Sequence, residues 1–204
     1  MDKLQIAFPL TEEFRKKHHI PTFPIKTSNI AVDDPDWKMR LKLNSWWEAE
    51  QLETGRSIAE FTAGSDHNRS EKEYQEFQIL HSILLSIGGS ETCFPCTEED
   101  MAAILERGYF HNGVSKMMLG EPSRCHSNVC ELWERNHKSA DVRICTGYAL
   151  SADGMWRQHS WLAHYYKTPA QSRMRIIETT AKRVAYYGFE MAKEEAEKFS
   201  YFNL

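Results

Sequence analysis

The dipeptide Asp153-Gly154 lies between two stretches rich in β-branched and aromatic residues, 142–150 and 155–165. Both central residues of a type I′ turn need positive φ angles, which Asp and Gly adopt readily, so this pair is the strongest short-range signal for a β-hairpin. The sequence therefore predicts two antiparallel strands joined at this turn, against which the rest of the chain has to pack.

The register of the hairpin decides which side chains share a face. A two-residue turn pairs Ala152 with Met155 and places His159 opposite Tyr148. In that register the face of His159 also carries Thr146, Leu150, Arg157 and Trp161. A shift by one residue would send His159 to the other face.

Two more strands and a helix are expected after the hairpin. Thr168-Pro169 interrupts the strand pattern, after which residues 173–180 predict a third strand and residues 184–189 a fourth. Residues 190–199 interleave apolar and charged side chains at helical spacing, so they predict a terminal helix.

The first half of the chain is predicted to be mostly helical. Residues 33–55 open with acidic residues and a proline, residues 70–87 open with a capping box and end before two glycines, and residues 97–108 end at a glycine. Residues 1–32 contain three prolines and little periodicity, so we expect an extended arm there. The first helix is expected to place three tryptophans in the core: Trp37, Trp46 and Trp47.

Helices followed by a hairpin-based sheet predict an α+β fold. A chain of 204 residues is long enough for one substantial core, whereas two domains would each be small. We therefore expect one compact domain with three parts: the arm over 1–32, a helical region over 33–117, and a half over 118–204 in which a helix packs on the antiparallel sheet.

Composition and charge exclude several classes of protein. Lys and Arg number 25 against 29 Asp and Glu, a formal net charge of -4, and no basic block is present that could clamp a nucleic acid backbone. We find no signal peptide and no apolar segment long enough to span a membrane. Five cysteines without an export signal favour free thiols. We expect a cytoplasmic protein, although export without a cleavable signal would leave the same pattern.

Residues 120–124, Gly-Glu-Pro-Ser-Arg, form a loop that leads into a predicted helix. Val129, Leu132 and Trp133 recur at helical spacing, which places Cys125 at or just before the helix N-terminus. Unpaired N–H groups and the helix dipole stabilise an anion at that position. Cys125 is therefore a candidate thiolate nucleophile.

His159 and Glu178 are the candidate partners of Cys125. An imidazole takes the thiol proton and later protonates the leaving group, while a carboxylate or amide orients the ring. In the predicted fold, His159 on the hairpin and Glu178 on the next strand point to the same side of a sheet packed on the Cys125 helix. Asp141, Asp153 and Thr180 compete with Glu178 for the orienting role.

Stabilisation of an oxyanion would come from the Cys125 backbone N–H and one further donor. The candidates for that donor are Ser123 and Arg124 in the preceding loop and Gln158 next to His159. Asn128 and His126 either belong to this site or cap the first turn of the helix.

The order Cys125, His159, Glu178 on helix, strand and strand resembles the papain-like superfamily in its broad sense, including its NlpC/P60, transglutaminase-like and bacterial effector branches. The resemblance covers about residues 118–190 and concerns architecture. The sequence Cys-Gly-Ser-Cys-Trp of papain is absent, His126 follows Cys125, and Glu178 stands where papain has Asn. The resemblance implies cofactor-free acyl transfer on an amide of a protein, peptide or small molecule: cleavage, glutamine deamidation or transfer to an amine.

Two other classes remain open. Cys93 and Cys96 have the spacing of a zinc knuckle, and Cys125, His126 and Cys130 could complete four ligands, although their spacing is unusual for a knuckle. The helical first half with its aromatic residues also suits a non-catalytic interaction protein. In either case Cys125 would be a structural cysteine, and His159 a strand residue that packs beside Trp161.

Overall fold

The computed structural model describes residues 10–25, 71–93, 98–111, 115–136, 141–168 and 171–204 of the chain. The helices in these residues are α1 (Glu12–Lys17), α4 (Glu71–Ile87), α5 (Met101–Arg107), α6 (Cys125–Asn136) and α7 (Lys193–Asn203). The strands are β1 (Glu91–Cys93), β2 (Tyr109–His111), β3 (Ser115–Met117), β4 (Val142–Leu150), β5 (Met155–Lys167), β6 (Ser172–Glu178) and β7 (Ala185–Glu190). The predicted α+β class is confirmed. The predicted helix over 33–55 and its tryptophans lie outside the described residues.

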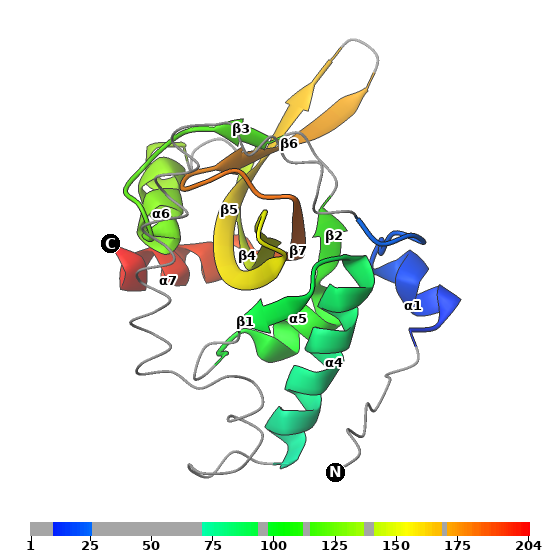
Figure 1. Ribbon diagram of the computed structural model, residues 1–204. Coiled ribbons are helices and arrows are strands. Elements are labelled where there is room, and N and C mark those ends of the chain that lie inside the picture. Colours follow the sequence, from blue (N-terminus) through cyan, green and yellow to red (C-terminus); the bar gives the residue numbers. More distant parts are fainter. Residues whose placement is uncertain (1–9, 26–70, 94–97, 112–114, 137–140, 169–170) are drawn as a thin grey trace.

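The described strands form one mostly antiparallel sheet in the order β2-β7-β4-β5-β6-β3, with β1 beside one end of β5. β4 pairs with β5 on one side and β7 on the other, so its residues are buried from Ile144 to Leu150. Figure 1 shows that β5 bends strongly and curls the sheet. The third and fourth strands predicted from the sequence correspond to β6 and β7.

The hairpin forms at the predicted place, but its turn has three residues. The Ser151 N–H donates to the Met155 carbonyl at 3.0 Å, and Gly154 closes the loop with a φ of 87°. The extra residue moves the register by one, so His159 pairs with Gly147 and not with Tyr148. This corrects the two-residue turn assumed from the sequence.

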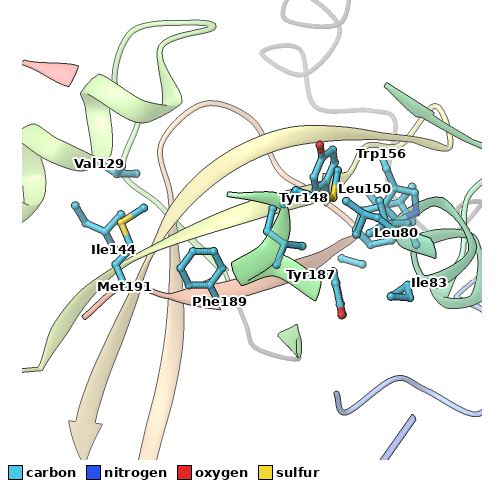
Figure 2. Close-up of a cluster of buried hydrophobic side chains, with 14 of the residues drawn as sticks. Leu80, Ile83, Val129, Ile144, Tyr148, Leu150, Trp156, Tyr187, Phe189 and Met191 are labelled. Carbon is cyan, nitrogen blue, oxygen red and sulfur yellow. The ribbon is translucent and has the colours of Figure 1, made fainter. Parts of the chain in front are cut away.

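Because side chains alternate along a strand, this register places His159 and Tyr148 on opposite faces. The face of Tyr148 packs against α4, α5, α6 and α7 and contains the larger core, part of which Figure 2 shows. The face of His159 contains a smaller cluster that includes Cys145, Trp161 and Tyr186. The sequence analysis placed Thr146 and Leu150 on the face of His159, but they lie on the opposite face. Trp161 lies on the face of His159, as expected.

One edge of β5 is covered at its two ends by different strands. β1 pairs with residues 155–157, and β6 pairs with residues 162–167. Between them, residues 158–161 have no strand partner on that edge within the described part of the chain. We call these residues the open interval of β5. The first turn of α6 contacts it, because the His126 ring hydrogen-bonds to Ser160.

The first half of the chain contributes more than helices. β1, β2 and β3, which the sequence analysis does not predict, extend the sheet at three places. The expected extended arm contains helix α1, where the Thr11 hydroxyl accepts a hydrogen bond from the Phe14 N–H as an N-cap. The terminal helix begins at Lys193, because Glu190 still belongs to β7.

Candidate functional site

Cys125 is the first residue of α6, as the sequence predicts. It is a free cysteine and its side chain is partly exposed. The loop that leads to it is held on β6 by two backbone hydrogen bonds: the Met118 N–H donates to the Glu178 carbonyl at 2.9 Å, and the Gly120 N–H donates to the Thr179 carbonyl at 2.8 Å. The end of β6 therefore positions both the Cys125 loop and the side chain of Glu178.

His159 and Glu178 form a buried pair. The Nε2 atom of His159 lies 2.9 Å from Oε2 and 3.1 Å from Oε1 of Glu178. The two residues are only 2% and 0% exposed. Because Nε2 bonds to the carboxylate, Nδ1 is the nitrogen left for a second partner.

Further donors converge on the Glu178 carboxylate. Oε1 accepts hydrogen bonds from the N–H groups of Thr179 and Thr180, both at 2.9 Å, and from the Thr180 hydroxyl at 3.1 Å. Oε2 accepts the Tyr186 hydroxyl at 2.9 Å. Several hydrogen-bond donors around one buried carboxylate favour its charged form. The sequence analysis missed Tyr186, which reaches Glu178 from β7.

The competitors of Glu178 lie in other contacts. Asp153 forms an ion pair with Arg157 at 2.7 Å beside the hairpin turn. The carbonyl of Asp141 accepts the Tyr165 N–H at the far end of the hairpin. Thr180 is part of the arrangement, but as a donor to Glu178. Glu178 is thus the carboxylate that contacts His159.

Electrostatics links this pair to Cys125. Burial disfavours the thiolate, but the charge of His159 and hydrogen bonds from His126 and His159 outweigh it and hold the pKa of Cys125 well below its ordinary value. Burial also opposes charge on His159, yet Glu178 and Cys125 raise the pKa of His159 to about 9. The pKa of Glu178 falls to about 2 despite its burial, mainly because of the charge of His159.

The geometry differs from the expectation in one respect. His159 and Glu178 share a face, as predicted, but it is the face opposite to the one on which Val129 and Trp133 of α6 pack. The N-terminus of α6 lies beside the open interval of β5, where no strand of the described residues covers the edge. The charge and a hydrogen bond of His159 act on the Cys125 thiol, so the two groups approach each other past this strand edge.

His126 is a second imidazole at the same sulfur. Its Nδ1 atom lies 4.0 Å from the Cys125 Sγ and 2.7 Å from the Ser160 Oγ. Burial opposes its charge, but the hydrogen bond and charge of Cys125 raise the pKa of His126. The sequence analysis left two alternatives for His126, a residue of the site or a cap of the first helical turn. Its contact with Ser160 joins residues far apart in sequence, which no local pattern could have predicted.

The residues expected to support an oxyanion have other partners. Asn128 holds the loop, because its Oδ1 accepts the Glu121 N–H at 3.0 Å and its Nδ2 donates to the Glu121 carbonyl at 2.7 Å. Arg124 forms an exposed ion pair with the Glu121 side chain at 2.7 Å. Gln158 donates to Glu98 at 3.3 Å. The Cys125 N–H stays a candidate donor, since the first N–H groups of a helix have no partner within it.

The zinc alternative receives no support from the described residues. Among them, no group of three or more His, Cys, Asp or Glu side chains is arranged to hold a metal ion. The Cys130 Sγ is buried and contacts the Phe199 carbonyl at 4.0 Å, in the core between α6 and α7. Cys96 lies outside the described residues.

In comparisons with known proteins, no family model, curated protein or solved structure matches the chain. The helices within the described ranges are too short or too polar to cross a bilayer.

Proposed function

We propose that the protein is a thiol-dependent hydrolase or acyltransferase that acts on an amide bond, with Cys125 as nucleophile, His159 as general base and acid, and Glu178 as the group that orients His159. The observation that supports it most is the buried His159–Glu178 pair beside a partly exposed thiol at the start of a helix. A nucleophile, a base and a third group that orients the base are the parts that covalent catalysis needs.

The residues suit the following steps. His159 accepts the thiol proton through Nδ1, and the Cys125 sulfur attacks the carbonyl carbon of the amide. As the tetrahedral intermediate collapses, the C–N bond breaks and His159 returns the proton to the leaving nitrogen, which leaves a thioester on Cys125. Water or an amine then gives a proton to His159 and attacks the thioester, and the sulfur leaves and regains a proton.

Glu178 contributes in two ways. Its negative charge favours the imidazolium form of His159, which exists while the sulfur is a thiolate and in the tetrahedral intermediates. Its bond to Nε2 leaves Nδ1 as the nitrogen that would exchange the proton with the sulfur. The developing oxyanion would meet the Cys125 backbone N–H and the positive end of the α6 dipole.

A peptide, protein or small amide is the proposed substrate, consistent with the papain-like resemblance. We also propose a reducing compartment such as the cytoplasm, because Cys125, Cys130 and Cys145 are free thiols.

The test is a search for products that depend on one sulfur. The purified full chain is incubated with a complex peptide mixture, with and without a biotinylated alkylamine, and the products are read by mass spectrometry. Cleavage adds water, deamidation converts an amide to an acid, and transfer attaches the amine. We expect one of these products with the wild-type protein and none with Cys125→Ala. Products that persist in Cys125→Ala, or the absence of all three classes, would contradict the proposal.

A further inference from the structure

The sulfur of Cys125 has two imidazoles near it, and only His159 has a place in the steps above. His126 follows Cys125 in the first turn of α6, and its Nδ1 atom faces both the Cys125 Sγ at 4.0 Å and the Ser160 Oγ at 2.7 Å. Ser160 is fully buried in the open interval of β5. One nitrogen of His126 therefore contacts both the nucleophile and the strand that carries His159.

The surrounding bonds indicate which nitrogen of His126 carries a proton. The Ser160 hydroxyl donates to the Thr146 Oγ1 at 3.5 Å, so its oxygen is available to accept the N–H of His126. A thiolate near Nδ1 also requires a donor there. With the Ser160 proton given to Thr146 and the sulfur present as a thiolate, both neighbours of Nδ1 are acceptors, and a proton on Nδ1 serves them.

The ring is held in place from other elements. Phe199 of α7 packs edge-on against it, with ring centroids 5.3 Å apart. The titratable groups that act on His126 are Cys125 in its own helix, His159 on β5, Glu98 before α5 and Asp100 at the start of α5. Two of these neighbours are carboxylates, which favour a cationic His126, and His159 opposes it.

We propose that His126 is a further residue of the catalytic site, whose Nδ1–H holds the Cys125 sulfur as an anion and directs it, while the proton of each reaction step is carried by His159. This inference rests on the proposed function. In each catalytic cycle His126 neither gains nor loses a proton: its N–H turns toward the sulfur when the thiolate is free and keeps its bond to Ser160 when the sulfur is acylated. Ser160 is a positioning residue that acts through His126.

The arrangement separates two tasks that one imidazole performs in a simple Cys–His pair. An imidazole that both holds the thiolate as a cation and carries protons loses its charge when it protonates the leaving nitrogen, and regains it only as water or an amine attacks the thioester. A second fixed donor stays beside the sulfur throughout the cycle. Removal of His126 should therefore affect how easily the thiol ionises and how fast the enzyme turns over, and should leave substrate binding largely intact.

The experiment measures the rate at which iodoacetamide alkylates Cys125 as a function of pH, which reports the thiolate fraction without any substrate. The variants are His126→Leu, which removes the donor; His126→Asn, whose amide can place an N–H near the position of Nδ1; and Ser160→Ala. His164→Asn is the control, because His164 lies further along β5 and pairs with Val142 and Arg175, away from the site.

We expect His126→Leu to move the pH profile upward by about one unit, which lowers the alkylation rate roughly tenfold on the acidic limb. His126→Asn should recover part of the shift, Ser160→Ala should give a smaller one, and His164→Asn should give none. With a substrate, His126→Leu should lower kcat and leave KM nearly unchanged. Tm and near-UV circular dichroism establish that each variant is folded.

A pH profile of folded His126→Leu that equals the wild-type profile would overturn the inference. If that variant does not fold, Ser160→Ala decides in its place, and a wild-type profile for folded Ser160→Ala would overturn the inference. The two proposals fail separately: a shifted profile in a protein that turns over no amide contradicts only the proposed function, whereas amide turnover with an unshifted profile contradicts only the role of His126.

Discussion

The Nε2 atom of His159 lies 2.9 Å from one carboxylate oxygen of Glu178 and 3.1 Å from the other, with both side chains buried. A buried charge of this kind is stable only when it is paired and hydrogen-bonded. The pair also lies at the end of β6 that holds the Cys125 loop. The following predictions depend on this geometry.

Cys125→Ala should abolish activity and change Tm by no more than a few degrees. The Cys125 side chain is partly exposed at the first position of α6, where a shorter apolar side chain leaves no core cavity. Cys130→Ala in the same helix is the matched comparison. Cys130 is fully buried, so its loss should cost about 1 kcal/mol of unfolding free energy while activity is retained. Thermal unfolding and turnover of both variants give the result; unfolding of Cys125→Ala would identify a structural cysteine.

Glu178→Gln should lower activity roughly 100-fold or more, because the neutral amide no longer favours the imidazolium of His159. The pKa of His159 should fall from about 9, and that of the Cys125 thiol should rise. The cost in stability should be about 1–3 kcal/mol, since one amide group cannot satisfy all the donors around Glu178. Histidine NMR titration and urea unfolding measure the two effects. If the pKa of His159 were unchanged in Glu178→Gln, Glu178 would not be the group that stabilises the imidazolium.

The His159–Glu178 pair should make stability depend on pH in a defined window. The raised pKa of His159 contributes stability that is complete below its ordinary value of 6.5 and is lost as pH rises through about 9. The lowered pKa of Glu178 contributes stability that is complete above its ordinary value of 4.5 and is lost as pH falls through about 2. The contribution of the pair is therefore greatest between pH 4.5 and 6.5.

Urea unfolding across this range, in the wild-type protein and in Glu178→Gln, measures the pH dependence. The difference in unfolding free energy between the two proteins should be largest inside the window and should shrink toward both ends. A difference that does not change with pH would mean that the pair is not charged in the folded state.

Asn128→Ala should destabilise the protein by about 1–3 kcal/mol and displace the loop before Cys125, because it leaves both backbone groups of Glu121 without their partner. Asn136→Ala on the same helix is the control, since Asn136 is exposed and donates to the Leu132 carbonyl one turn earlier, within the helix itself. Urea unfolding and the alkylation rate of Cys125 measure both effects. Equal effects of the two substitutions would contradict the loop-holding role of Asn128.

A second route to the same loop is Gly120. A Cβ atom at this position would lie 2.5 Å from the Cγ and Oδ1 atoms of Asn128, closer than packed atoms allow. Gly120→Ala should therefore push the Asn128 side chain away from Glu121 and reduce the alkylation rate of Cys125. Because both substitutions act on one contact, the double variant with Asn128→Ala should be less damaging than the sum of the single changes. If the effects of the two substitutions on the alkylation rate simply added, Gly120 would not act through the Asn128 side chain.

Local sequence patterns predicted several parts of the fold. These parts are places where a helix or strand begins or ends, and each depends on neighbours in sequence. They are Gly88-Gly89 after one helix, the loop before Cys125 and the Asp153-Gly154 turn. The same patterns placed Cys125 on a helix, His159 on a strand and Glu178 on the next. Strands β1, β2 and β3 escaped prediction because three residues are too few to show an alternation.

What the sequence by itself determined is the type of element on which each candidate residue lies, since backbone propensity, capping and turn chemistry act over a few residues. The tertiary structure alone decided that His159 faces Gly147, that Tyr186 supports Glu178, and that His126 meets Ser160 beside the sulfur. One extra residue in a turn reverses a strand face, and contacts between residues far apart in sequence arise only when helices and strands pack. Local patterns contain neither kind of information.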